Sequence, residues 1–154
     1  MTERRALPRP ARPVARRWSI ALEGLTTAGA LAGVQGFLSG QFDPLVDQLT
    51  FIDGPAVPAL ALGVCIAVPQ GVAMVLGLRG HALAPQAALG AGVVLTGWVL
   101  AQLPLIGGES PVQWAFFAVG LAETALAVRW MVGRADRPST EPALRHPERR
   151  IHAR

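Results

Sequence analysis

Two glutamates lie inside stretches that are otherwise apolar, and these are the residues of the chain best placed to do chemistry. Glu23 is followed by Gly24 and two threonines, and Glu123 is followed by Thr124. If these stretches cross a membrane, a carboxylate near the bilayer centre costs at least about 2.5 kcal/mol. Such a carboxylate must be paired, protonated or turned toward a polar interior. The two glutamates are therefore the first candidates for a functional site.

Three hypotheses for these glutamates remain open. In the first, Glu123 exchanges a proton or binds a cation, with Glu23 and Gln70 in the same site, because burial favours the uncharged form of a carboxyl group. In the second, Glu123 is structural and accepts hydrogen bonds from a glutamine or threonine on a neighbouring helix. In the third, Glu23 forms an ion pair with Arg129 that joins the first apolar stretch to the last.

Other chemistry lacks the residues that it needs. Cys65 is the only cysteine, so the chain has neither a C-x-x-C pair nor an internal disulfide. The three histidines lie outside the apolar stretches, and no His, Cys, Asp and Glu cluster has metal-ligand spacing. No G-x-S-x-G motif or phosphate-binding loop is present. We therefore expect a protein that is not an enzyme and that has no cofactor and no metal.

Four apolar segments organise the chain. Each has the roughly 20 residues that a helix needs to cross a hydrocarbon core of about 30 Å. The sequence therefore predicts an all-α fold, a bundle of four transmembrane helices forming one membrane domain over residues 18–132. The segments are Trp18–Leu38, Ala56–Leu78, Leu83–Leu103 and Val112–Val132.

The basic residues are distributed unevenly around these segments. All fourteen are arginines: six precede the first segment, one lies between the second and third, and seven lie at or after the end of the fourth. The positive-inside rule then places both termini in the cytoplasm. We expect a multi-pass protein of the plasma (inner) membrane, and the absence of lysine with many Ala, Gly, Arg and Pro residues suggests a bacterial source.

The tails explain the net charge of +4. Residues 1–17 and 133–154 are rich in Arg and Pro with little to bury, so we expect them to be disordered cytoplasmic tails. Their arginines orient the helices and bind anionic lipid headgroups of the bilayer. Nucleic acid is not an expected partner.

Small residues recur every four positions in the first two segments. Such ridges let helix backbones approach closely in lipid. We expect the two segments to pack together through them, and the alternative is a homo-oligomer or a membrane protein partner. The predicted packing residues are Gly24, Ala28, Gly29, Gly33, Gly36, Ala59, Gly63, Ala67 and Gly71.

Three further features predict local structure. Asp43 as N-cap and Pro44 at the first helical position predict a short amphipathic helix, lying on the outer leaflet or capping the bundle. Pro69 predicts a kink in the second segment, with Gln70 satisfying the freed carbonyl. Gly80 is the expected C-cap of that segment.

Two short stretches resemble known families. Residues 21–27 (Ala-Leu-Glu-Gly-Leu-Thr-Thr) resemble the first helix of small multidrug resistance transporters, which would imply Glu23 as a shared proton and substrate site. The chain departs from that family in having no tyrosine and a strong charge bias, so this function is not transferred. Residues 97–121 resemble the last hairpin of small, DoxX-like bacterial membrane proteins, which implies a four-helix bundle and no particular activity.

The residues favour a non-enzymatic accessory or assembly component of the membrane that acts through its small-residue ridges. The alternative function is a small proton-coupled transporter that uses Glu123 together with Glu23. The carboxylates distinguish the two functions, because a transporter needs an accessible, titratable Glu123 and an assembly component does not.

Overall fold

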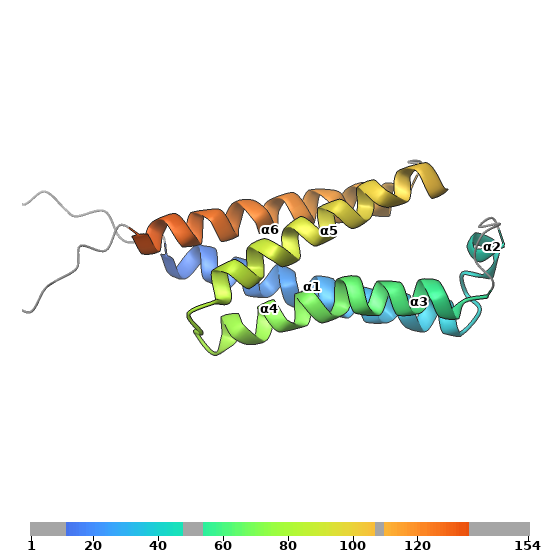
Figure 1. Ribbon diagram of the computed structural model, residues 1–154, viewed down its shortest axis with the longest axis horizontal. Helices are drawn as coiled ribbons and strands as arrows, with labels where there is room; N and C mark the ends of the chain where they lie inside the picture. The colour runs from blue at the N-terminus through green and yellow to red at the C-terminus, as the bar shows by residue number, and fades with distance from the viewer. Residues whose placement is uncertain (1–11, 48–53, 107–109, 136–154) are drawn as a thin grey trace, which may run out of the picture.

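The computed structural model describes residues 12–47, 54–106 and 110–135, and every regular element in these ranges is helical. The elements are α1 (Arg12–Leu38), α2 (Asp43–Val46), α3 (Ala56–Leu62), a π-helical turn η1 (Gly63–Ala67), α4 (Val68–Leu78), α5 (Ala84–Ile106) and α6 (Pro111–Ala135). Figure 1 shows these helices along the chain from α1 to α6.

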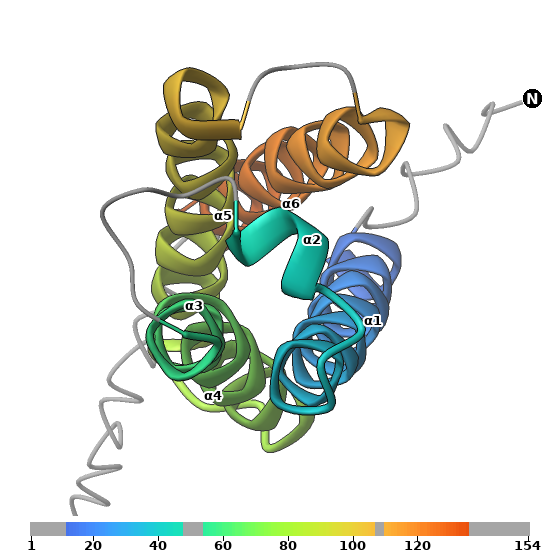
Figure 2. The same ribbon diagram turned by 90° about the vertical axis from the view of Figure 1, so that its right-hand side faces the viewer.

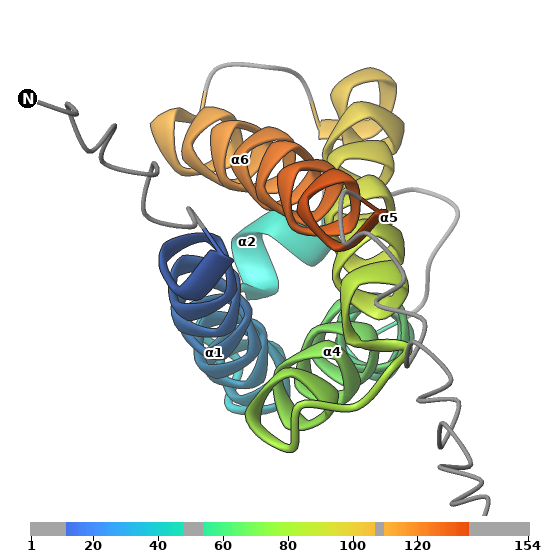
Figure 3. The ribbon, with the colours of Figure 1, turned by 90° about the vertical axis from the view of Figure 1, so that its left-hand side faces the viewer.

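Four helical rods surround a common axis. Viewed along that axis, α1, α4, α5 and α6 form a ring, and each rod packs on two neighbours (Figures 2 and 3). The rod α3–η1–α4 follows the second predicted segment. One end of the ring carries α2, and we call it the α2 end. The other carries Arg16, Arg134 and the α4–α5 turn, and we call it the arginine end. The predicted all-α bundle is confirmed.

Three of the rods are long and apolar enough to cross a membrane, namely Ala56–Leu78, Ala84–Leu105 and Pro111–Arg134. The fourth, α1, is longer but less apolar, because it contains Glu23, two threonines, Gln35 and several glycines. Large apolar side chains such as Leu25, Leu60 and Val72 are more than half or about half exposed. Apolar outside and polar inside is the arrangement of a multi-pass membrane protein.

Several helix boundaries differ from those predicted. Helix α1 begins at Arg12, so part of the predicted N-terminal tail is helical. Helix α5 continues through Pro104 to Ile106, beyond the predicted end of its segment at Leu103, and α6 extends to Ala135. The remaining predicted tail residues, 1–11 and 136–154, lie outside the described residues.

The glycine ridges of α1 and the second rod pack against each other as expected. A Cβ at Gly33 would lie 2.6 Å from Leu62 Cδ2, and one at Gly24 would lie 3.2 Å from Met74 Sδ. Further along, Gly63 faces Val34, while Gly71 faces Thr27; Ala59 and Ala67 are buried. The close approach of the two rods therefore depends on the absence of side chains at these positions.

The remaining ridge positions have other surroundings. Gly29 faces the Phe116 ring of α6, and Gly36 faces Phe42, which precedes α2. The prediction for Ala28 is wrong, because this residue lies on the exposed face of α1. The four-residue spacing drifts around a helix of 3.6 residues per turn, so one ridge cannot face the same neighbour along its whole length.

Helices α5 and α6 pack through two glycines that were not among the predicted packing residues. A Cβ at Gly92 would lie 2.8 Å from the Thr124 backbone nitrogen, and one at Gly120 would lie 3.0 Å from that of Thr96. Each threonine hydroxyl donates to the carbonyl of the glycine four residues earlier, at 2.9 Å for Thr96 and 2.8 Å for Thr124. The two Gly-x-x-x-Thr units thus interlock reciprocally.

The second rod changes its helical pattern before Pro69. Residues Gly63–Ala67 form a π-helical turn, and α-helix resumes at Val68. Since a proline ring clashes with the carbonyl four residues earlier, a wider turn before it relieves that clash. The sequence predicted a kink at Pro69, and the structure has a π-helical turn directly before it.

The two connections at opposite ends confirm the predicted turn chemistry in part. Helix α2 spans Asp43–Val46 with Phe42, not Asp43, at its N-cap. It lies across the α2 end, between the rods rather than beside them (Figure 2), so it caps the bundle. At the other end Gly80 has φ +65°, and the His81 N–H donates to the Leu76 carbonyl, which completes a Schellman C-cap.

Candidate functional site

Glu123 lies inside the bundle, where side chains from two other rods hold its carboxylate. The Gln70 amide nitrogen of α4 donates to Oε2 at 2.7 Å, and the Thr26 hydroxyl of α1 donates to Oε1 at 3.1 Å. Glu123 is 1% exposed, and both donors are equally buried. The hypothesis that a glutamine or threonine on a neighbouring helix binds Glu123 is therefore confirmed for both residue types.

Gln70 has a different role from the one predicted. Its amide nitrogen also donates to the Ala91 carbonyl of α5 at 3.5 Å, so it does not bind a carbonyl freed by Pro69 in its own helix. The side chain links α4, α5 and α6 at one level of the bundle. Its Oε1 atom is buried and has no hydrogen-bond partner among the described residues.

Glu23 lies nearer the arginine end and is also 1% exposed. Neither of its carboxylate oxygens has a hydrogen-bond partner among the described residues, and Oε2 approaches Gly77 of α4. Arg129 is exposed, so the proposed Glu23–Arg129 ion pair is wrong. Glu23 instead lies one turn from Thr26 on the same face of α1, and the Thr26 hydroxyl donates to Glu123, so both carboxylates belong to the same interior. Two buried carboxylates in one interior cannot both be charged without a large cost.

A polar stripe on α1 runs from Glu123 to the arginine end. Arg16, Ser19, Glu23 and Thr26 are three or four residues apart, so they lie on one face of the helix. Ser19 is 1% exposed, and its hydroxyl has no hydrogen-bond partner among the described residues. The stripe therefore places two unpaired side chains, Ser19 and Glu23, between Arg16 and the Glu123 carboxylate.

The arginine end is closed by apolar packing and by two arginines. Beyond the carboxylates, Ala88, Ala127 and Trp130 belong to a buried cluster that also contains Ala15 and Ala84. Arg16 donates from Nε and Nη2 to the Gly77 carbonyl at 3.1 and 3.0 Å. Its guanidinium thus caps the last turn of α4. Its positive charge also lies at the negative end of the helix dipole, which is a stabilising position. Arg134 does the same for the α4–α5 turn through the Ala82 carbonyl at 2.7 Å.

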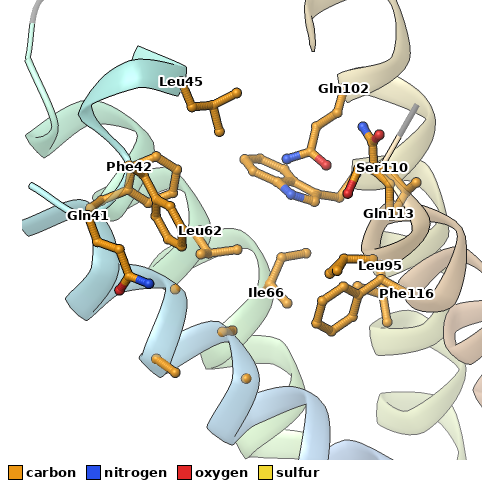
Figure 4. A pocket seen from close by; sticks show the side chains of 18 residues that line it. Gln41, Phe42, Leu45, Leu62, Ile66, Leu95, Gln102, Ser110, Gln113 and Phe116 are labelled. Atoms are coloured by element: carbon orange, nitrogen blue, oxygen red, sulfur yellow. The ribbon is translucent and has the colours of Figure 1, made fainter. Parts of the chain in front are cut away.

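The α2 end is hollow by contrast. A pocket of about 560 Å³, which we call the end pocket, opens between the rods and α2. Figure 4 shows Gln41, Phe42 and Leu45 on one side of it and Gln102, Ser110 and Gln113 on the other. Ile66, Leu95 and Phe116 lie deeper (Figure 4). The prediction placed no ligand cavity here.

A thin apolar layer separates the end pocket from Glu123. Ala30, Ile66 and Leu95 line the pocket and are buried together. Each lies four residues from a member of the carboxylate site, Thr26, Gln70 or Ala91 respectively, which is a rise of about 6 Å along a helix. One turn of apolar side chains is thus the barrier between the pocket and the buried carboxylate.

The buried polar atoms of this site are mostly oxygens. Among the described residues no three His, Cys, Asp or Glu side chains gather, as a metal site would require. The unpaired atoms are oxygens of Glu23, Ser19 and Gln70. A carboxyl group buried among oxygens can hold a proton and donate it to a neighbouring acceptor.

No protein-family model matches the chain, and neither a curated protein nor a solved structure does so. The chemistry of the site therefore has to be argued from this chain's own residues. The structure brings Glu123, Gln70 and Glu23 together in one interior, as the first hypothesis required. Sequence reasoning missed Thr26, Ser19 and Gln113. The three- and four-residue spacing of polar side chains in α1 was the available signal for the first two.

Proposed function

We propose that this protein is a small proton-coupled membrane transporter in which Glu23 and Glu123 bind and release the coupling proton. The observation that carries the proposal is the unpaired Glu23 carboxylate, buried in the same interior as the bonded Glu123 carboxylate. A purely structural glutamate is expected to have partners, since a buried polar group without hydrogen bonds lowers stability. Buried groups that cost stability are characteristic of functional sites.

Access from both ends supports the same proposal. The polar stripe of α1 leads from the arginine end toward Glu123, and the end pocket approaches it from the other side. Alternating access requires two paths that meet at a site near the middle of the membrane. In the arrangement described here, apolar residues close both paths. We interpret the bundle as an occluded state.

The proposal includes an orientation in the membrane. The arginine end, with the tails, faces the cytoplasm and the α2 end faces outward, in a bacterial plasma membrane. The arginines of the tails bind anionic lipid headgroups. Transport of this kind transforms no substrate, so the protein is not an enzyme.

Carbodiimide labelling tests the proposal, because the reagent modifies protonated carboxyl groups inside membranes. The protein is reconstituted in liposomes and labelled between pH 6 and pH 9, and each site is assigned by mass spectrometry. We expect labelling of Glu23 or Glu123 that decreases as pH rises, since deprotonation removes the reactive form. Glu23→Gln and Glu123→Gln serve as site controls. Absence of labelling at both positions throughout the pH range would refute the proposal.

A non-enzymatic accessory or assembly role is the second candidate. It is favoured by the two hydrogen bonds to Glu123, which can act as a structural clasp between α1, α4 and α6. The ridge glycines support it less, since Gly24, Gly33, Gly63 and Gly71 pack within the chain and are not free for a partner. Under this alternative, Glu123→Gln keeps a hydrogen-bonding side chain and changes no activity.

A further inference from the structure

The end pocket contains a polar side chain that nothing in the described structure satisfies. Gln113, in the first turn of α6, is 7% exposed and lines the pocket. Neither its Nε2 nor its Oε1 has a hydrogen-bond partner in the part of the chain that the structure describes. A buried carboxamide without partners costs stability, whereas a leucine at the same place would not. Gln113 therefore presents one donor group, its amide NH2, and one acceptor atom, its carbonyl oxygen, to a molecule in the pocket.

The rest of the lining defines the body of such a ligand. Four aromatic side chains contribute to the wall, and the other deep residues are aliphatic. No charged side chain belongs to the described lining, and the layer of Ala30, Ile66 and Leu95 shields the pocket from the carboxylates. A charged ligand would lose its hydration without gaining a partner. The aromatic residues are Phe37, Phe42, Trp98 and Phe116.

We propose that the end pocket is a binding site for an uncharged, largely aromatic or apolar small molecule that carries a neighbouring hydrogen-bond donor and acceptor, which pair with Gln113. The cavity volume of about 560 Å³ lies within the usual range for small-molecule sites. Gln102 and Ser110 lie beside Gln113 (Figure 4) and supply further polar contacts at the mouth. The apolar layer of Ala30, Ile66 and Leu95 lies between this site and the carboxylates, so ligand binding here can be measured whether or not the carboxylates exchange protons.

Equilibrium dialysis with 2-naphthamide as the probe tests this inference. The full chain is placed in lipid nanodiscs, and the uptake of empty nanodiscs is subtracted. The primary amide of the probe offers the donor and acceptor that complement Gln113, and its rings match the aromatic wall. Naphthalene, 2-naphthoate and 2-naphthylmethylammonium are the comparison probes, because they lack the amide or carry a charge.

We expect saturable binding of 2-naphthamide that weakens about 10-fold in Gln113→Leu, the loss expected for two hydrogen bonds. Gln35→Leu makes the same chemical change at an exposed position of α1 outside the pocket and should leave binding unchanged. The charged probes should bind at least about 10-fold more weakly, because their charge finds no partner in the pocket. Naphthalene should bind Gln113→Leu as well as it binds the wild type, which also shows that the variant pocket is intact.

Three outcomes would overturn the inference: uptake no greater than that of empty nanodiscs, binding that Gln113→Leu leaves unchanged, or charged probes that bind as tightly as the amide. If Gln113→Leu fails to fold, Gln113→Met replaces it with an apolar side chain of similar length. None of these outcomes bears on carbodiimide labelling of Glu23 and Glu123, so the two proposals fail separately.

Discussion

The two ends of the bundle differ in how their interiors are filled. Toward the arginine end, small residues bring the rods into close contact, and the cluster around Ala88, Ala127 and Trp130 fills the interior. Toward the α2 end, the rods and α2 leave a pocket of about 560 Å³ between them. The carboxylates lie where the two halves meet. The packed half fixes their positions, and the hollow half brings a cavity within one helical turn of Glu123.

The polar residues of the two halves also differ in whether their side chains have hydrogen-bond partners. At the arginine end, Arg16 and Arg134 donate hydrogen bonds to backbone carbonyls. Among residues 12–47, 54–106 and 110–135, Gln113 of the α2 end has no hydrogen-bond partner. In the middle, Glu123 is bonded and Glu23 is not. A buried polar group without a hydrogen bond lowers the stability of the fold. The positions of such groups are therefore the ones that we assign to binding of a proton or a ligand.

The largest effect should come from breaking the close packing of α5 on α6. Gly92→Val places a branched side chain against the Thr124 backbone, and we expect the free energy of unfolding to fall by about 3 kcal/mol. Gly90→Val on the same helix meets nothing within 4 Å and should change it by less than about 0.5 kcal/mol. Thermal unfolding in detergent micelles measures both. Equal effects would mean that α5 and α6 do not interlock at Gly92.

The second prediction concerns the bonded carboxylate. Gln70→Leu removes the donor to Glu123 Oε2 and leaves a buried oxygen unpaired, so we expect a loss of about 2 kcal/mol. Gln35→Leu, at an exposed position, serves as the matched control and should be nearly neutral. Denaturant titration followed by circular dichroism measures the difference. An unchanged stability of Gln70→Leu would show that the Gln70–Glu123 bond does not hold the middle of the bundle together.

The third prediction compares the two glutamates directly. Glu23→Leu removes two buried oxygens that have no hydrogen-bond partner among the described side chains and backbone groups, so we expect the protein to gain about 1 kcal/mol of stability. Glu123→Leu leaves the Gln70 and Thr26 donors unpaired and should lower stability instead. Unfolding curves of the two variants at one pH test the opposite signs. A loss of stability in Glu23→Leu would indicate that Glu23 has a structural partner, which contradicts its assigned role.

The smallest effect is expected at the arginine end. Arg16→Ala removes the side chain that caps α4, and we expect a loss of about 0.5 kcal/mol. Arg17→Ala lowers the net charge equally at an exposed position, so it controls for charge alone. Both are measured by thermal unfolding at low and high salt. Identical shifts in unfolding temperature for the two variants would show that the Arg16 cap does not stabilise this end of the bundle.

Most of the fold could be predicted from the sequence because its signals are local. Runs of about 20 apolar residues indicate membrane helices whatever their neighbours, and the glycine at position 80 suffices for a C-cap. Boundaries were less accurate at Arg12 and Pro104, since helix ends depend on what lies next to them. The small-residue ridges predicted the contact of α1 with the second rod but not the exposure of Ala28. A four-residue spacing drifts around a helix of 3.6 residues per turn, so some ridge positions turn away from the neighbouring rod.

The site was predictable in its members but not in its geometry. Glu123, Glu23 and Gln70 stand out as polar residues in apolar stretches, and a hydrogen-bonded Glu123 was one of the hypotheses. The Glu23–Arg129 pair was wrong, because depth in the membrane does not determine which way a side chain faces. Gln113 gave no signal, since a glutamine near a helix start is ordinarily exposed.

The sequence by itself determined that four apolar segments form helices and that two carboxylates enter the apolar region, because both follow from residue type and spacing. Only the tertiary structure decided which carboxylate is bonded, where the interior is hollow and which polar atoms remain unpaired. These properties arise from the rotation and separation of packed helices, which depend on contacts between residues far apart in the chain.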